Sequence, residues 1–305
     1  MQRNQLHVDK LLSNVSIKYS NPEFIHSKVF PMLPVGKETD KIRIYTRNIK
    51  IQETDRADKG KAREASFEMS NSSYSLEKHA LKEYVSDDEV ALNDMGDLRA
   101  DTVEYLSDHI QLRKEKSFAD LFSTKANWSN NVSLAATQQF NSNTVTSNPV
   151  PIFDTAASVV MKQSGFKANN AIIPHDSFIS IKNHTSILDR VKYTSSEISE
   201  PMIASLLGVG ELQVPAAQYD SAAEGLAESL SDLYSDNAWV GYTAKRPGLR
   251  QASAGYMLQQ KGREGQYVRR WKDEERDCEA IEVNSKHLFK LVATLCGYLI
   301  VDTQA

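Results

Sequence analysis

Cysteine, clustered histidine and long apolar runs are all scarce in this chain of 305 residues. Its two cysteines, Cys278 and Cys296, flank an apolar, strand-like region without partners at metal-ligand spacing, so we expect two buried free thiols. The seven histidines are scattered, and none has a second histidine or a cysteine four residues away, which argues against a metal site. The longest apolar run, residues 291–301, is about half the length of a membrane span. The first residues lack the apolar core of a secretory signal, so we expect a soluble protein of a reducing cytoplasm, without a membrane partner.

Motifs for catalysis are also missing. Residues 208–210, Gly-Val-Gly, lack the third glycine and the lysine of a phosphate loop, and we interpret them as a helix end. His175, Asp176 and Ser177 are adjacent in the sequence, whereas the members of a catalytic triad converge from separate segments. A hydrolase of mixed α/β type would have to use His175 or His184 with Ser177. We therefore predict no catalytic, cofactor-binding or metal-binding residue, no cofactor and no enzyme activity.

The charge of the chain argues against tight binding of nucleic acid. A net charge of -4 comes from 36 basic and 40 acidic residues, which we interpret as well mixed along the sequence. The best basic and aromatic cluster is Arg269-Arg270-Trp271-Lys272, which fits either a weak, nonspecific contact with a nucleic-acid backbone or the end of a surface strand.

The longest expected helix covers residues 97–123. At about 1.5 Å per residue it would be about 40 Å long, which suits a strut. Its apolar stripe follows the 3.6-residue period, and charges occupy the other face, so we expect a helix on a surface and not one enclosed by a bundle. The stripe comprises Leu98, Tyr105, Leu106, Ile110, Phe118, Leu121 and Phe122. The charged face comprises Arg99, Asp101, Glu104, Asp108, Arg113, Lys114, Glu115 and Asp120.

Two extended segments precede this helix. Residues 1–40 contain short apolar islands broken by prolines, which predicts an arm that lies along its own subunit or along a neighbour. Residues 41–51 and 66–76 alternate as strands, and the fourteen residues between them carry eight charges and one glycine. We expect a long hairpin with a charged tip, for which a merely solvated loop is the plain alternative.

The remaining pattern predicts an α+β protein. Ser86 and Glu89 form a capping box before a short helix. Residues 123–150 are polar and predict an irregular connection with a buried Trp128. A helix is expected from Asp154 to Gly165, another from Asp176, and a third between Ser199 and Gly208, with a polar stretch at residues 218–237. Further strands are expected at residues 171–173, 211–214, 238–243, 256–260, 266–271, 277–284 and 289–301.

In this order, the arm, hairpin, long helix, mixed body and closing strands resemble the major capsid proteins of tailed bacteriophages, which have the Hong Kong 97 shell fold. Three segments also resemble the sequences of these proteins: AIIPHDSFISIKNHTSILDRVKYT (171–194), VPAAQYDSA (214–222) and DNAWVGYT (236–243). The resemblance implies five parts. They are an N-terminal arm (1–40), an extended β-hairpin loop (41–76), a peripheral domain with its spine helix (77–150 and 97–123), an axial domain (151–249) and peripheral strands that complete the fold (250–305).

The resemblance also implies a function and partners. Such a subunit assembles with itself into pentamers and hexamers of an icosahedral head that encloses double-stranded DNA, and it contacts the packaged DNA nonspecifically. Its location is the virion, after assembly in the cytoplasm of the host bacterium. No long charged helix opens the chain, which implies a separate scaffolding protein, and portal and decoration proteins are further expected partners. An encapsulin-type nanocompartment, which encloses an enzyme, is the alternative within the same fold.

Overall fold

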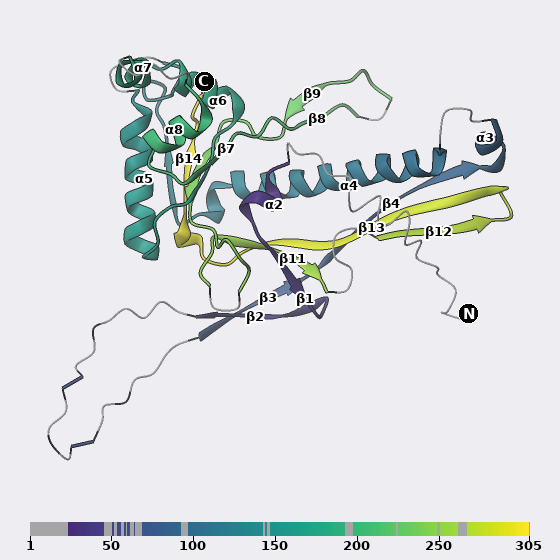
Figure 1. The fold of residues 1–305 in the computed structure, drawn as a ribbon, viewed down its shortest axis with the longest axis horizontal. Coiled ribbons are helices and arrows are strands. Elements are labelled where there is room, and N and C mark those ends of the chain that lie inside the picture. Colours follow the sequence, from purple (N-terminus) through teal and green to yellow (C-terminus); the bar gives the residue numbers. More distant parts are fainter. Residues whose placement is uncertain are drawn as a thin grey trace.

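The computed structural model describes residues 24–45, 51, 54–55, 58, 60–61, 64, 69–92, 97–142, 144, 147–192, 198–223, 225–248, 251–261 and 267–304. Within them, one sheet runs along the length of the molecule and a second stands at one end of it (Figure 1). The predicted arm before residue 24 and most of the predicted hairpin tip lie outside the described residues.

The first sheet is built around one long strand. β13 pairs antiparallel with β4 on one side and, one after the other, with β12 and β11 on the other side. β1 extends the sheet by pairing parallel with β11. The bounds are β1 Met32–Val35, β4 Glu77–Ser86, β11 Gly255–Gln260, β12 Tyr267–Asp273 and β13 Cys278–Leu291.

The long strand β13 corrects the predicted strands at 277–284 and 289–301. Ser285, Lys286 and His287 suggested a break because they are polar, but they continue the ladder opposite β4. Ser285 and His287 are buried there and hydrogen-bond to each other. The break comes later, at a 3-10 turn over Thr294–Cys296, after which β14 (Gly297–Val301) leaves for the second sheet.

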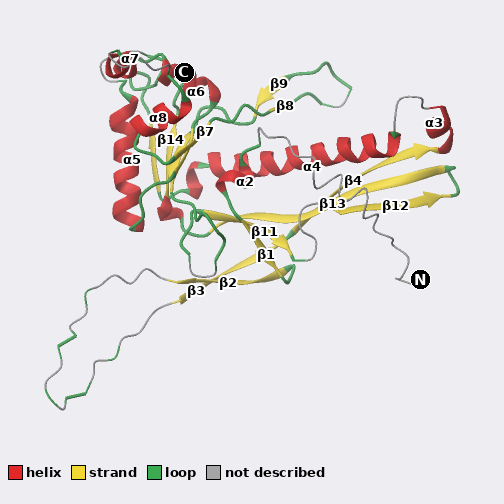
Figure 2. Ribbon diagram, viewed as in Figure 1, coloured by secondary structure: helices red, strands yellow, loops and turns green. Residues whose placement is uncertain are grey.

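The helix α4 (Leu98–Ser123) lies along the first sheet, as Figure 2 shows, and confirms the predicted long helix. Asp97 caps it by accepting a hydrogen bond from the backbone N–H of Arg99 at 3.0 Å. Its first half buries an apolar cluster against the sheet, which includes Val103, Leu106, Ile110, Ile281 and Val283.

Before α4, the short helix α3 (Asp87–Leu92) begins with the predicted capping box. The Ser86 N–H donates to Glu89 Oε2 at 3.0 Å, and the Glu89 N–H donates to Ser86 Oγ at 3.1 Å.

The second sheet has the order β5-β14-β10-β6-β7, and four helices pack with it around a separate apolar core. Its strands are β5 Asn130–Ser133, β6 Asn170–Ile172, β7 Glu211–Gln213, β10 Ala238–Gly241 and β14. Its helices are α5 Pro149–Ser164, α6 His175–Lys182, α7 Thr185–Val191 and α8 Glu200–Leu206. β14 therefore pairs with β10 of the predicted axial domain, and β5 pairs with β14, although the predicted boundaries at residues 150 and 250 group both strands with the peripheral domain.

Local signals placed most helix ends in this half correctly. Gly165 ends α5 in the left-handed region at φ 81°, and Gly208 follows α8 at φ 69°, which confirms residues 208–210 as a helix end. The predicted start of α5 at Asp154 is wrong, because Asn148 caps the helix by accepting a hydrogen bond from the backbone N–H of Val150. Trp128 is buried as predicted, after a 3-10 turn at Lys125–Asn127.

Two hairpins extend from the sheets. The predicted hairpin contains β2 (Thr39–Tyr45) and β3 (Met69–Ser75), which pair antiparallel from Thr39 opposite Ser75 to Tyr45 opposite Met69. A second hairpin, β8 (Gln218–Asp220) with β9 (Leu230–Asp232), occupies the stretch that was expected only to be polar. Strands of three residues are too short to show the alternation by which a strand is recognised.

Candidate assembly interface

The described part of the arm lies along its own subunit. The short helix α2 (His26–Val29) packs on α4, and Phe24, Ile25, Val29 and Phe30 are buried in an apolar core that they share with α4. The Phe30 ring meets Phe118 of α4 edge-on, with ring centroids 5.0 Å apart. This core also contains residues of both sheets and of the base of the β8–β9 hairpin. The arm is therefore part of what joins the two sheets.

A buried carboxylate fastens the arm to the helix. Glu115 Oε1 accepts hydrogen bonds from the backbone N–H of Ile25 at 3.0 Å and from the Tyr234 hydroxyl at 2.5 Å. Its Oε2 accepts the backbone N–H of His26 at 3.1 Å and lies 2.6 Å from His26 Nδ1. Residues from two distant segments, the arm and the base of the β8–β9 hairpin, thus meet at one side chain of α4.

The surroundings of Glu115 favour its ionised form. Burial by itself opposes ionisation, but the hydrogen bonds from His26, Tyr234 and Ile25, together with the charge of His26, outweigh burial and lower the pKa of Glu115. The pKa of Tyr234 is raised well above its usual value by burial and by the Glu115 charge. The pair is therefore a phenol that donates to a carboxylate, a strong, charge-assisted hydrogen bond.

Lys114 and Glu115 correct the prediction that they belong to the charged, exposed face of α4. Both are buried, whereas Tyr105, which was placed in the apolar stripe, is 59% exposed. Lys114 lies four residues before Phe118 and Glu115 lies three before it, so both share the covered face of the helix. The arm and the base of the β8–β9 hairpin widen that covered face beyond the sheet.

Basic side chains gather beside Lys114, between α4 and the first sheet. His287 of β13 and His79 of β4 have ring centroids 4.6 Å apart, and His287 Nε2 is buried without a hydrogen-bond partner. Burial lowers the pKa of His287 to about 2, with contributions from Lys114, His79, His26 and Arg113. Burial also lowers the pKa of Lys114 to about 8. Burial where the helix covers the sheet therefore keeps His287 neutral and shifts Lys114 toward its neutral form.

Among the residues that the structure describes, the β2–β3 hairpin is anchored at its base. Tyr74 is buried near Ala244, Tyr256 and Leu258, and its hydroxyl donates to the carbonyl oxygen of Lys37 at 3.2 Å. Away from this base the described side chains are mostly exposed, and Ile51 is fully exposed. In the described part of the chain, β2 and β3 pair only with each other.

The residues that a hydrolase would need do not meet. Ser177 is buried, and its hydroxyl forms a hydrogen bond with the Thr303 hydroxyl, at 2.7 Å. His184 instead caps α7: its Nδ1 accepts the backbone N–H of Ser186, and its Nε2 lies 3.3 Å from Ser147 Oγ in a buried position. His175 is exposed at the start of α6.

The predicted basic cluster on β12 is partly neutralised. Arg270 pairs with Glu279 at 2.8 Å and Lys272 pairs with Asp87 at 2.8 Å, which favours the surface-strand interpretation for both. Cys278 and Cys296 are buried thiols that form no disulfide, as predicted. Among the described residues, no group of histidine, cysteine and acidic side chains is placed to hold a metal ion, and no described helix is long and apolar enough to cross a membrane.

One signal in the sequence was missed. The charges are not well mixed, because the fifty-two residues from 193 to 244 contain no lysine or arginine. They contain eight acidic residues: Glu197, Glu200, Glu211, Asp220, Glu224, Glu228, Asp232 and Asp236. The β8–β9 hairpin lies in the middle of this stretch.

Comparison with known proteins identifies relatives. No protein-family model matches the chain. The major capsid protein of Burkholderia phage BcepMu is 26% identical over 268 residues, which covers 84% of each protein. The crystal structure of a phage-related protein from Bordetella bronchiseptica RB50 matches with a TM-score of 0.78 and 25% identity, over 98% of both chains.

More distant structures share the fold alone. The capsid structure of cyanophage P-SCSP1u matches with a TM-score of 0.57 at 10% identity, over 88% of this chain and 85% of that one. An encapsulin from Synechococcus elongatus PCC 7942 matches with a TM-score of 0.56 at 10% identity, over 93% and 89%. Together with the arm, hairpin and long helix, these similarities confirm the predicted fold: the chain has the Hong Kong 97-type shell fold, and its sequence is similar to the major capsid protein of Burkholderia phage BcepMu.

Proposed function

We propose that this chain is the major capsid protein of a phage head, and that copies of it form the pentamers and hexamers of an icosahedral shell around double-stranded DNA. The observation that carries the proposal is the β2–β3 hairpin. A two-stranded hairpin is marginally stable by itself, and this one extends apolar side chains such as Ile51 and Met69 into solvent. Such an element gains stability when it buries area on a neighbouring subunit.

The division into domains belongs to the same proposal. The first sheet with α4 would form the peripheral domain, and the second sheet with α5 to α8 would form the axial domain. Because β5 and β14 pair in the second sheet, the proposed boundaries move so that both strands join the axial domain. The β2–β3 hairpin would bridge subunits, and a scaffolding protein, a portal and decoration proteins would be further partners.

Size-exclusion chromatography with light scattering, followed by negative-stain microscopy, tests this function. The chain is expressed alone and with a candidate scaffolding protein. Rings of five or six subunits, or closed shells tens of nanometres across, are the expected result. A stable monomer under both conditions would contradict the proposal.

An encapsulin-type compartment is the second candidate, because an encapsulin shares the fold. The contents of shells purified from the native source distinguish the two. Nuclease-resistant double-stranded DNA is expected for a phage head, and an enclosed protein is expected for a compartment.

A further inference from the structure

We propose that the β8–β9 hairpin is an acidic docking element that inserts beside α2 of a second copy of this chain, in a hollow bordered by Lys28 and Lys245. This inference rests on the proposed shell function and assigns one of its contacts between subunits. The hairpin comprises residues 218–232, and the hollow is defined below.

The hairpin is free to meet a partner. Its two strands pair only with each other among the described residues, and Figure 1 shows it extending away from the second sheet. Residues 218–232 contain four acidic side chains and no basic one. Leu226 and Leu230 are 72% and 61% exposed. A preformed projection that combines negative charge with exposed leucines has the composition of a contact surface.

The hairpin is also held in shape before any partner binds. Asp220 Oδ1 accepts the backbone N–H groups of Ala222 and Ser229, both at 2.9 Å, and these hydrogen bonds lower the pKa of Asp220. Ser221 Oγ donates to the carbonyl oxygen of Ser229 at 2.9 Å across the strands. An ordered element loses less conformational entropy on binding than a mobile loop does.

The base of the hairpin is fixed to the body. Ala217, Leu233 and Tyr234 are buried in the core that contains the arm, and Tyr234 donates to Glu115. Lys116 of α4 lies over the Tyr219 ring, with Nζ 4.9 Å from its centroid. The direction in which the hairpin points is therefore set by the same residues that hold the arm.

The same chain carries a hollow of complementary charge. A hollow of about 350 Å³ lies between α2 and the edge of the second sheet, and its lining includes Lys28, Lys245 and Glu211. Arg246 follows Lys245, and both are exposed and form no ion pair with any residue that the structure describes. The two lysines outnumber the one acid, so an acidic hairpin with a leucine near its tip fits the hollow in charge.

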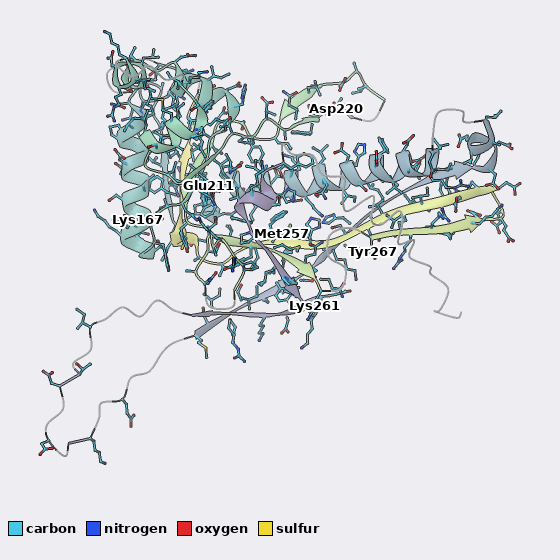
Figure 3. All side chains as sticks on the ribbon, in the orientation of Figure 1. Lys167, Glu211, Asp220, Met257, Lys261 and Tyr267 are labelled. Atoms are coloured by element: carbon cyan, nitrogen blue, oxygen red, sulfur yellow. The ribbon has the colours of Figure 1, made fainter. Side chains whose placement is uncertain are left out.

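The occupant of the hollow comes from a second copy. In Figure 3, Asp220 lies on the hairpin away from Glu211 at the hollow, and the hairpin continues beyond Asp220 in the direction that leads away. A subunit therefore does not fill its own hollow. Nucleic acid is a poor partner for the hairpin, because phosphate and the hairpin carry the same sign of charge.

A charge exchange between the two surfaces tests the inference. Three variants are compared with the unchanged chain: Glu228→Lys on the hairpin, Lys245→Glu with Arg246→Glu at the hollow, and all three changes together. Assembly at low ionic strength is followed by light scattering and sedimentation velocity. Each of the first two variants is expected to assemble about tenfold more slowly, because charges at a contact act mainly on association. The combined variant is expected to recover.

Asp189→Lys is the matched control, since Asp189 is an exposed acid on α7 and the change in charge is the same as for Glu228→Lys. Urea unfolding of the unassembled variants checks that their folds are intact. The inference is overturned if Glu228→Lys assembles as fast as Asp189→Lys. Failure of the combined variant to recover also overturns it, and a basic protein that co-sediments with the hairpin would then be the partner.

A separate measurement distinguishes failure of the inference from failure of the shell function. Leu226→Cys and Arg246→Cys are made in one chain, in which both native cysteines are buried, and the protein is oxidised with oxidised glutathione. Disulfide-linked dimers and longer chains are expected even if closed shells never form. If the unchanged chain forms shells and no linked species appears, the inference fails while the shell function stands.

Discussion

Glu115 shows how one side chain can join segments that are distant in the sequence. It lies on α4, and its carboxylate accepts four hydrogen bonds from α2, the residue before α2 and the base of the β8–β9 hairpin. A buried carboxylate without these donors would carry a large desolvation cost. Since the donors are present, the carboxylate sets the position of the arm on the helix.

Glu115→Gln is expected to weaken this junction. The amide keeps the shape of the carboxylate, but it offers one accepting oxygen where Glu115 offers two. Some of the donors therefore lose their partner, and the free energy of unfolding should fall by about 2 to 3 kcal/mol. Urea unfolding of the unassembled subunit measures it, and hydrogen exchange at the Ile25 and His26 amides should become faster. Glu104→Gln, a partly exposed carboxylate on the same helix, is the control. Equal losses in the two variants would contradict the role of Glu115.

The same variant should change the acid response. The pKa of Glu115 is lowered in the folded state, so ionised Glu115 stabilises the fold above its unfolded pKa, near 4.5, and this stabilisation is lost as the pH falls through the folded value. Glu115→Gln removes the ionisation. Its unfolding free energy should therefore depend less on pH below about 4.5 than that of the unchanged chain.

Unlike Glu115, His287 is buried in its neutral form, and its lowered pKa makes the stability of the fold depend on pH in a different range. Its folded pKa is about 2, against an ordinary value of 6.5, so below pH 6.5 the unfolded chain binds a proton that the folded chain does not. Stability therefore falls as the pH drops from 6.5, by about 2 kcal/mol at pH 5. Lys114, Arg113, His79 and His26 surround the ring, so protonation would add a charge to a basic neighbourhood.

His287→Phe is expected to remove that dependence. Urea unfolding at pH 8, 6.5 and 5 should show a shallower slope than in the unchanged chain. The lost hydrogen bond to Ser285 lowers stability at every pH and leaves the slope unaffected. His109→Phe, an exposed histidine on α4, is the control. A slope unchanged in His287→Phe would show that the ring is protonated in the fold.

At the scale of elements, the position of the arm depends on its close approach to β11. A Cβ built on Gly255 would lie 2.5 Å from the Phe30 ring and 3.0 Å from the carbonyl oxygen of Lys290. Only a residue without a side chain lets the arm cross β11 where Phe30 packs on α4. β1 then pairs with β11 directly after this crossing.

Gly255→Ala is therefore expected to displace Phe30. The overpacked site should cost about 1 to 3 kcal/mol of unfolding free energy, and the amides of β1 should exchange faster with deuterated water. Gly36→Ala is the matched control, because a Cβ there meets no atom within 4 Å. Protection of β1 as strong as in the control would show that the arm adapts without loss.

At the scale of the whole molecule, the two sheets share one apolar core, and two hairpins extend from them (Figure 1). The β2–β3 hairpin leaves Ile51 fully exposed, and the β8–β9 hairpin leaves two leucines exposed. These side chains bury little area within one subunit and so contribute little to its stability. Their burial is expected only in an assembly.

Ile51→Asp tests that expectation. Unfolding of the unassembled subunit should not change, whereas assembly should weaken by at least about tenfold, because a buried isoleucine side chain is worth roughly 1.5 to 3 kcal/mol. Sedimentation velocity over a range of protein concentrations measures the assembled fraction. Thr54→Asp, an exposed polar residue of the same loop, introduces the same charge without removing an apolar group. Equal assembly of the two variants would place Ile51 outside the contacts.

The sequence by itself determined the features that depend on neighbours along the chain. The long helix, its Asp97 cap, the Ser86 and Glu89 box and the glycine stops at Gly165 and Gly208 follow from side chains within one or two turns. The β2–β3 pairing also follows from local alternation. The order of these elements was enough for the resemblance to a shell protein.

Tertiary structure alone decided what depends on contacts across the chain. Lys114 and Glu115 look like solvated charges until the arm and the β8–β9 hairpin cover them. β5 and β14 belong to the second sheet because their hydrogen-bond partners are there. The periodicity of a strand does not identify the strand with which it pairs. Burial and pairing are properties of surfaces that meet only after folding, so local pattern carries little information about them.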